Sequence, residues 1–230
     1  MKNIIDQTPN EQLHGRLKFV SSYVKKSDLK NKKVLDIGCG YGWFEIYAKS
    51  KNVRSIIGTE LSEQDLLTAK RYIHEKNVFF QIANAIQLPF KDSTFDTVVS
   101  WEVLEHIPNG TEPVMFSEIV RVLKKNGVCY FSTPHRSFIS TLLDPAYWII
   151  GHRHYKKEDI YKFLINKKLS ILNMRLVGGW WEIINLLNLY ISKWIFRRTC
   201  FFQKYFDKKL DEEFGKQNGF TNIFFRLQKM

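Results

Sequence analysis

The 230-residue chain contains little cysteine and no long uninterrupted apolar run. Its three cysteines, Cys39, Cys129 and Cys200, are scattered and form no C-x-x-C pair. This spacing argues against a disulfide scaffold or a thiolate zinc site and favours a reducing compartment. The chain has no uninterrupted run of 18 apolar residues, so a membrane-spanning helix is not expected. Residues 1–15 lack the apolar core of a signal peptide. We therefore expect a cytoplasmic protein, with any membrane contact made from the cytoplasmic face.

Acidic residues are scarce toward the C-terminus, and the formal net charge of the chain is +12. Residues 1–150 hold 19 Lys and Arg against 16 Asp and Glu, whereas residues 151–230 hold 16 against 7. A basic C-terminal third indicates an anionic partner, such as a membrane surface, a nucleic acid or an acidic substrate. Solubility alone is the alternative explanation of this charge.

Internal repeats are absent, and apolar strand-like runs alternate with helical patterns up to residue 134. This alternation predicts an α/β fold in which helices cover both faces of a mainly parallel sheet. Strands are expected at 32–37, 54–60, 77–83, 95–101, 128–133, 169–179 and 219–228. Helices are expected at 43–50, 63–75, 113–124, 156–168 and 180–198. The aromatic segment 135–155 shows no regular pattern and is interpreted as an insertion or lid.

The sequence VLDIGCGYG (34–42) places Gly38, Gly40 and Gly42 directly after the first strand. Ligands of open α/β sheets bind at the carboxyl ends of strands, where glycines let a ligand touch the backbone. The dinucleotide fingerprint G-x-G-x-x-G fails because Trp43 occupies its last position. Glu60 ends the second strand, where an acid can bind ribose hydroxyls, although an ordinary exposed strand-end glutamate is the alternative.

Four motifs in order resemble those of the class I S-adenosylmethionine-dependent methyltransferases, in particular the type 11 and quinone O-methyltransferase-like members. They are VLDIGCGYG (34–42), IIGTEL (56–61), the block 84–109 and the block 118–134. The resemblance implies S-adenosylmethionine as cofactor and a Rossmann-like seven-stranded, mainly parallel sheet whose last strand is antiparallel. It covers residues 11–134 well, so we expect a cofactor-binding core at 1–134. Residues 135–230 would complete the same sheet and add an acceptor-side lid and a basic amphipathic helix, within a single domain.

The resemblance also implies which residues bind the cofactor. The glycine loop surrounds the methionine part, Asp36 reaches its amino group through water, and Glu60 takes both ribose hydroxyls. Asn84 stands where the family commonly has Asp; its carbonyl can still accept a hydrogen bond, with less charge assistance. Arg16 and His14 are candidates for binding the cofactor carboxylate, unless 11–20 is only a solvated helix. The full implied set is Arg16, Asp36, Gly38, Cys39, Gly40, Gly42, Glu60, Leu61, Asn84, Ala85 and Trp101.

Methyl transfer is an in-line displacement from a sulfonium, for which the protein supplies alignment and a dry site. An oxygen acceptor also has to lose its proton, usually to His, Asp or Glu. His106, in WEVLEH after the fourth strand, is the first candidate base, and His135 after the fifth strand is the second. The segment GHRH adds His152 and His154, and each histidine could instead be structural.

The run Glu102-x-x-Glu105-His106 could hold a divalent metal, completed by a histidine from GHRH. It resembles the metal-binding motif of small-RNA 2′-O-methyltransferases, but similar runs are widespread in metal-free relatives, so we predict no metal. Two motifs of other acceptor chemistries are missing. The [DN]-PP-[YF] motif of amino-group methyltransferases is replaced by STPH, and no Pro-Cys pair supplies a cytosine-directed nucleophile.

The predicted helix 180–198 carries one narrow polar stripe, formed by Glu182, Asn185, Asn188 and Ser192. The rest of its surface is apolar and rich in tryptophan, with Lys193, Arg197 and Arg198 at its end, as in helices that lie in a membrane interface. A lid over the active site and a dimer contact are the alternatives.

We therefore predict methyl transfer to an oxygen atom of a small-molecule acceptor that is lipid-like or lipid-linked. A quinone precursor or a lipid-carried glycan would fit the apolar, basic C-terminal region. An RNA methyltransferase is the second hypothesis, although no RNA-binding module accompanies the charge. A catalytically inactive, cofactor-binding partner protein is the third. The sequence predicts no oligomeric state.

Overall fold

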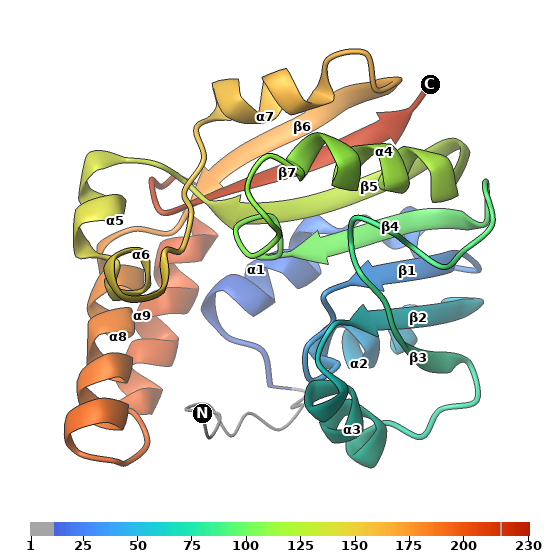
Figure 1. Cartoon of the computed structure of the whole chain (residues 1–230). Coiled ribbons are helices and arrows are strands. Elements are labelled where there is room, and N and C mark those ends of the chain that lie inside the picture. Colours follow the sequence, from blue (N-terminus) through green and yellow to red (C-terminus); the bar gives the residue numbers. More distant parts are fainter. Residues whose placement is uncertain (1–11, 217) are drawn as a thin grey trace.

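The computed structural model describes residues 12–216 and 218–230. Its centre is a seven-stranded sheet with strand order β3-β2-β1-β4-β5-β7-β6 (Figure 1). Neighbouring strands from β3 to β5 are parallel, whereas β7 is antiparallel to both β5 and β6. The predicted α/β fold with an antiparallel last strand is confirmed. The strands are β1 (Lys33–Ile37), β2 (Ser55–Glu60), β3 (Val78–Ile82), β4 (Phe95–Trp101), β5 (Leu123–Pro134), β6 (Leu169–Val177) and β7 (Asn222–Lys229).

Helices cover both faces of this sheet and enclose two apolar cores (Figure 1). Phe116 of α4 and Ile160 of α7 belong to the core on one face. Phe19 of α1, Phe44 of α2 and Phe214 of α9 belong to the core on the other. The bounds of these helices, together with those of α3, are α1 (Gly15–Tyr23), α2 (Trp43–Lys49), α3 (Glu63–Tyr72), α4 (Glu112–Val122), α7 (Lys157–Leu164) and α9 (Gln203–Gly215).

The alternation of β1 decides where its acid lies. Successive side chains of a strand point to opposite faces, and Leu35 and Ile37 enter the core beneath α4. Val34 enters the core beneath α2. Asp36 therefore points to the α2 face, where it is 1% exposed.

The C-terminal part of the chain enters the sheet in a different order from its sequence. β7 lies between β5 and β6, with Ser132 of β5 paired to Phe224 of β7. Before β7, α9 packs against α1, and the carboxylate of Asp211 accepts hydrogen bonds from Gly15 N (2.7 Å) and Lys18 Nζ (2.7 Å). Segments about 200 residues apart in the sequence are thus bonded to each other.

Several parts of the chain differ from the sequence prediction. The segment expected to be irregular contains α5 (Phe138–Leu143) and α6 (Pro145–Ile150), capped by Ser137 and Asp144. Helices of six residues are too short for apolar periodicity to reveal them. The helix expected at 180–198 divides into α8 (Trp180–Tyr190) and a π-helical turn, η2 (Ile191–Ile195). A short 3₁₀ turn, η1 (Lys26–Asp28), and helix α9 were not predicted.

Candidate functional site

The glycine loop after β1 is shaped by three left-handed backbone conformations. Gly38, Gly40 and Gly42 have φ of +75°, +52° and +84°, which side-chain-bearing residues rarely adopt. Gly38 N–H donates to the Thr59 carbonyl over 2.8 Å, which ties the loop to the end of β2. A Cβ on Gly38 would lie 2.3 Å from Cγ2 of Val103, whereas one on Gly40 would meet nothing within 4 Å. The loop is therefore closed against the segment after β4 but open for a ligand at Gly40.

The carboxylate of Glu60 lies beside this loop. Its Oε2 accepts from Gly40 N over 3.2 Å, and its Oε1 accepts from Leu61 N over 2.8 Å. The Leu61 side chain is 66% exposed at the same edge of the sheet. An acid at the end of the second strand offers acceptors for ribose hydroxyls, and the apolar side chain next to it offers a surface for the base.

Asp36 and Glu45 form a pair of buried acids behind the loop. Asp36 is 1% exposed and Glu45, in the first turn of α2, is fully buried. Within the described residues, Oδ1 of Asp36 and both carboxylate oxygens of Glu45 lack a hydrogen-bond partner. Burial raises the pKa of Asp36 well above its usual range, as does the neighbouring Glu45, and burial raises the pKa of Glu45 to about 8. These unpaired acid oxygens fit the predicted binding of the cofactor's amino group, since an ammonium would supply the missing donor.

Of the other residues predicted to bind the cofactor, Asn84 is already hydrogen-bonded, whereas Cys39, Ala85 and Trp101 are buried. Asn84 is exposed, but its Oδ1 already accepts from Ile86 N over 3.1 Å. Ala85 is buried next to it. Cys39 is buried, and burial raises its thiol pKa. Trp101 at the end of β4 is 8% exposed, and its indole N–H has no partner among the described residues.

Arg16 reaches from α1 to the segment after β4. Its Nη1 donates to Oε2 of Glu102 (2.7 Å) and to Oδ1 of Asn222 (3.3 Å). Glu102 has a φ of +54° and its other oxygen accepts from Ser132. A positive φ is unfavourable for glutamate, so the contacts with Arg16 and Ser132 hold Glu102 in a strained conformation. His14, the other candidate from this segment, instead pairs with Asp211 of α9.

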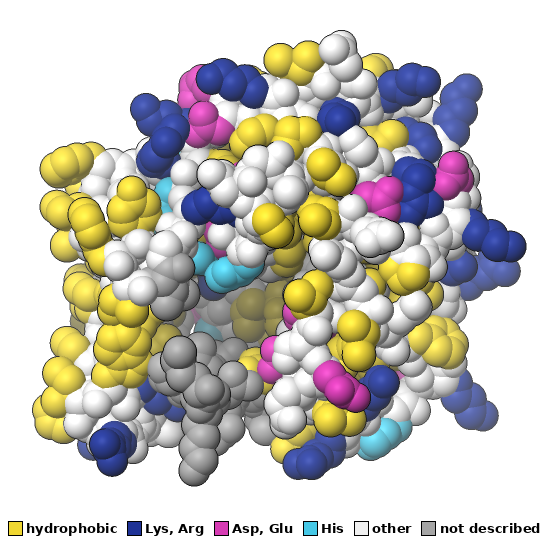
Figure 2. All heavy atoms as spheres, viewed as in Figure 1, with side chains coloured by type: hydrophobic (Ala, Val, Ile, Leu, Met, Phe, Trp, Pro, Cys, Tyr) yellow, Lys and Arg dark blue, Asp and Glu magenta, His cyan; other side chains and the backbone are white. Residues whose placement is uncertain are grey.

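A pocket of about 290 Å³ lies between the segment after β4, helices α5 and α6, helix α8 and the start of β7. Figure 2 shows histidine side chains beside a hollow in this face of the molecule. Both polar and apolar side chains line the pocket. The polar lining includes Arg16, Glu102, His106, Asp144, His152, His154, Glu182 and Asn222. The apolar lining includes Leu143, Ala146, Ile183 and Leu186, with Tyr190 beside them.

Two of the three predicted catalytic histidines, His106 and His154, line this pocket. His135 is not among its lining residues, and its Nδ1 hydrogen-bonds the Phe220 carbonyl (3.1 Å). His154 has both ring nitrogens engaged, with Asp144 (2.8 Å) and with Thr141 (3.2 Å). By contrast, the ring of His106 forms no hydrogen bond with any described residue, and its centroid lies 4.9 Å from that of the His152 ring.

The protonation states of His106 and His152 differ. Burial lowers the pKa of His106, so its imidazole is neutral at neutral pH. Burial also disfavours the charged form of His152, but the hydrogen bond to Asp144 and the nearby negative charge of Glu105 outweigh this effect and raise its pKa to about 9. Because a general base has to be unprotonated, His106 fits that role and His152 does not.

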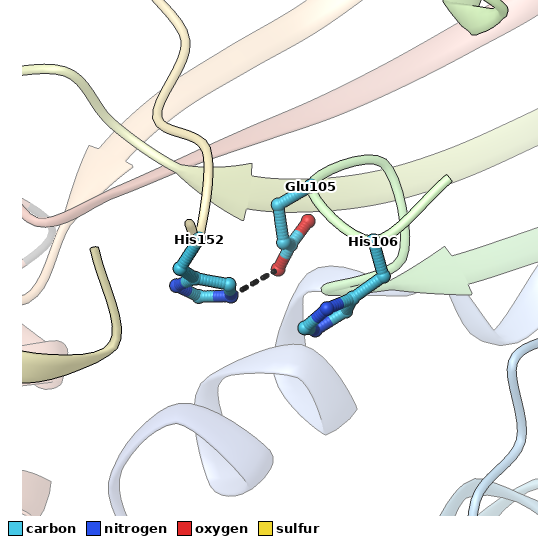
Figure 3. A group of neighbouring side chains, drawn as sticks. All are labelled: Glu105, His106 and His152. Carbon is cyan, nitrogen blue, oxygen red and sulfur yellow. Dashed lines mark ion pairs between the residues drawn. The ribbon is translucent and has the colours of Figure 1, made fainter. Parts of the chain in front are cut away.

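The same histidines satisfy part of the metal motif considered in the sequence. Glu105, His106 and His152 present ligand atoms that all lie within 4.8 Å of one another (Figure 3). Oε1 of Glu105 is 3.7 Å from Nε2 of His152 and is buried without a hydrogen-bond partner in the described chain. This mixed oxygen and imidazole set fits a divalent cation. Glu102 does not join it, because its carboxylate is bonded to Arg16 and Ser132.

Arg153 joins two segments that line the pocket, although no sequence motif indicated this role. Its guanidinium donates to the carbonyls of Leu104 (3.0 Å), Glu105 (3.2 Å) and Ile107, and to the carboxylate of Glu112 (2.8 Å). The segment carrying His152 is thereby fixed to the segment carrying His106. The one feature of the sequence that could have indicated Arg153 is its position between His152 and His154 in GHRH. Asp144, which binds both His152 and His154, was also missed.

Comparison with known proteins assigns the first part of the chain. Residues 35–131 match the family model described as a methyltransferase domain. The chloroplastic tocopherol O-methyltransferase of Arabidopsis thaliana is 37% identical over 117 residues, which are 48% of this chain and 32% of that protein. A ubiquinone biosynthesis O-methyltransferase of Coxiella burnetii is 32% identical over 139 residues, covering 59% and 55%. The match thus spans about half the length of these relatives or less.

A further relative and two solved structures extend over more of the chain. The ubiquinone biosynthesis O-methyltransferase of Pelagibacter ubique is 28% identical over 75% of this chain and 79% of its own length. An S-adenosylmethionine-dependent methyltransferase from Mesorhizobium loti has a TM-score of 0.61 at 16% identity, covering 88% and 93%. The [4+2]-cyclase SpnF has a TM-score of 0.67 at 16% identity, covering 96% and 89%. At such identities the structural likeness establishes the fold alone.

Proposed function

This chain belongs to the class I S-adenosylmethionine-dependent methyltransferases, and we propose that it transfers a methyl group to a hydroxyl oxygen of a small molecule. Three relatives, which match 117, 139 and 193 residues, are O-methyltransferases. The absence of an amino-group motif in the sequence supports the same acceptor atom.

The observation that carries this proposal is the position of one loop. Val103 packs against Gly38 of the glycine loop. Glu102 and His106, on either side of Val103, line the pocket. The predicted cofactor cradle and the acceptor pocket therefore share this loop as a common wall. Such an arrangement can align an acceptor with the methyl group that bound S-adenosylmethionine supplies.

In the proposed mechanism, His106 removes the proton of the acceptor hydroxyl. Its lowered pKa keeps the accepting nitrogen free at neutral pH. Arg153 holds the loop that carries His106, through the carbonyls of Leu104 and Glu105. Protonated His152 would attract an acceptor oxygen as negative charge develops on it. Helices α5, α6 and α8 would exclude water from the pocket.

We infer that the acceptor is lipid-like or lipid-linked, as a quinone precursor or a lipid-carried glycan would be. The pocket supports this class because polar and apolar side chains both line it. An amphipathic molecule would place its hydroxyl near His106 and its apolar part near Leu186 of α8. The enzyme would then be a cytoplasmic protein that works at a membrane surface.

A second possibility concerns assistance by a divalent metal. Glu105, His106 and His152 would hold it, and the ion would polarise the acceptor oxygen. His106 could not then act as the base. Turnover that is unchanged after dialysis against chelator would reject this alternative, whereas loss of turnover and its recovery on adding Mg²⁺ or Zn²⁺ would support it.

Methyl-labelled S-adenosylmethionine incubated with the protein and a fractionated cell extract tests the proposal. Label in the lipid fraction is expected, and His106→Gln should abolish it. Label in the RNA fraction would instead establish an RNA methyltransferase. Cofactor binding without label in any fraction would favour a catalytically inactive partner protein.

A further inference from the structure

Helix α8 turns its polar stripe toward the protein. Glu182 accepts from Nδ2 of Asn222 over 2.6 Å, and Nδ2 of Asn188 donates to the Phe201 carbonyl over 2.8 Å. Ser192 in η2 is fully buried and donates to Asn188. Glu182, Asn188 and Ser192 therefore form hydrogen bonds with neighbouring parts of the chain.

A second side of α8 and η2, next to the polar stripe, is apolar and exposed. Trp180, Ile184, Ile191 and Ile195 are 52%, 43%, 45% and 70% exposed, and their spacing of four, seven and four residues places them on one helix face. A helix at a water surface has the reverse arrangement, with its polar side outward. The exposure of this apolar side to water is unfavourable, and exposed apolar patches of this kind are typical of interaction surfaces.

Helices α5 and α6 extend the exposed apolar surface. Phe138 is 83% exposed and Trp148 is 65% exposed. Hydrophobic side chains follow the left edge of the molecule over α5, α6 and α8 in Figure 2. We call Phe138, Trp148, Trp180, Ile184, Ile191 and Ile195 the apolar face.

The charge next to the apolar face has one sign. Residues 183–206 contain Lys193, Arg197, Arg198 and Lys204 but no Asp or Glu. Arg197 and Arg198 are exposed directly after η2, and neither forms an ion pair with a described residue. A partner for this surface has to combine apolar groups with negative charge.

We propose that the apolar face docks on an anionic membrane surface, with α8 and η2 lying in the interface and Arg197 and Arg198 at the headgroups. In the described part of the chain, no helix has the length and hydropathy to cross a bilayer, so the contact is peripheral. A symmetric contact with a second copy is disfavoured, because it would bring the unpaired arginines of both copies together.

Docking would also deliver the acceptor, a consequence that rests on the proposed function. Three apolar residues of these helices line the pocket, namely Leu143 at the end of α5 and Ile183 and Leu186 of α8. The helices that carry the apolar face thus also form the pocket wall. An acceptor dissolved in the membrane could enter between them without crossing water.

Sedimentation with vesicles tests docking without cofactor or acceptor, so its result is independent of catalysis. The protein should bind vesicles of phosphatidylcholine with 30% phosphatidylglycerol and bind pure phosphatidylcholine far more weakly. The double variant R197Q/R198Q should lose about 25-fold in partition coefficient, near fivefold per charge. W148S/I195S should lose at least tenfold, and the tryptophan emission of the native protein should shift to the blue on binding.

Matched substitutions on α3 and β3 serve as controls. K70Q/R71Q removes two adjacent exposed cations, and L67S/F79S removes two apolar side chains that are 53% and 52% exposed. Both should bind vesicles as the native protein does. Equal losses in test and control variants would overturn the proposal, as would absence of binding to the anionic vesicles. Dimerisation that depends on Ile195, without vesicle binding, would assign the face to a second copy instead.

Discussion

At the residue scale, the pocket separates histidines by their surroundings. His152 is held between two carboxylates, His154 has both nitrogens engaged, and only His106 combines a free ring with a lowered pKa. Four histidines looked similar in the sequence because their roles depend on partners that are distant along the chain.

His106→Gln tests this distinction. Turnover should fall by roughly 10² to 10⁴, because a positioned general base contributes about that factor. The affinity for S-adenosylmethionine, measured by calorimetric titration, should stay within about threefold. His135→Gln is the matched control and should retain turnover. The reverse pattern, with His135 essential and His106 dispensable, would move the base to the end of β5.

The buried acid Glu45 predicts a pH dependence of stability. Its pKa rises from 4.5 to about 8 on folding because of burial, so the folded state retains a proton that the unfolded state releases. The stabilisation is therefore complete below pH 4.5 and is lost as the pH rises to about 8, at up to about 1.4 kcal/mol per pH unit.

Glu45→Gln removes this titration, so its Tm should fall less than that of the native protein between pH 5 and 8.5. Calorimetric scans without cofactor measure the difference. Glu63→Gln, at an exposed position of α3, should follow the native curve. Parallel curves for all three proteins would contradict the assignment.

At the element scale, α8 is capped by a neighbouring helix. Its N-cap residue is Gly179, which provides no side chain. Glu213 of α9 replaces the cap, with its carboxylate accepting from Gly179 N (2.9 Å), Trp181 N (2.8 Å) and Glu182 N (3.0 Å). A negative charge at a helix N-terminus is favourable, so α9 determines where the helix that walls the pocket begins.

Glu213→Ala should lower the stability by about 1.5–3 kcal/mol, because three backbone donors lose a charged acceptor. For a chain of this size that loss corresponds to a fall in Tm of roughly 3–12 °C, which differential scanning calorimetry can measure. Glu212→Ala removes the adjacent acid, which contacts only Lys209 at 3.3 Å, and should change the Tm by less than about 2 °C. Equal effects of the two substitutions would exclude the capping role.

At the scale of the whole molecule, the last strand unites both halves of the chain. β7 pairs with β5 and β6, and its Phe224 and Phe225 enter the two different cores. The C-terminal segment therefore stabilises the sheet that also carries the glycine loop.

A chain that ends at residue 215 should lose cooperative unfolding, because β5 and β6 would have no partner between them. Thermal scans by circular dichroism measure this loss. Removal of Met230 alone, which is 65% exposed, should leave a cooperative transition. A cooperative transition in the shorter chain would show that residues 12–215 fold without β7.

The sequence by itself determined the fold class, the glycine loop and the position of Glu60, because these depend on strand periodicity and on glycine conformations that are encoded locally. It also placed His106 after β4. The short helices α5 and α6 escaped prediction because six residues carry too little periodic signal.

Only the tertiary structure decided which of these residues act together. Arg153 and Asp144 became visible as organising residues of the pocket once the segment 144–154 was folded against the segment after β4. The sequence pattern of α8 showed an amphipathic helix but not that its polar stripe faces inward, since that direction depends on Asn222 and Phe201. Long-range contacts determine such choices, and a linear pattern does not contain them.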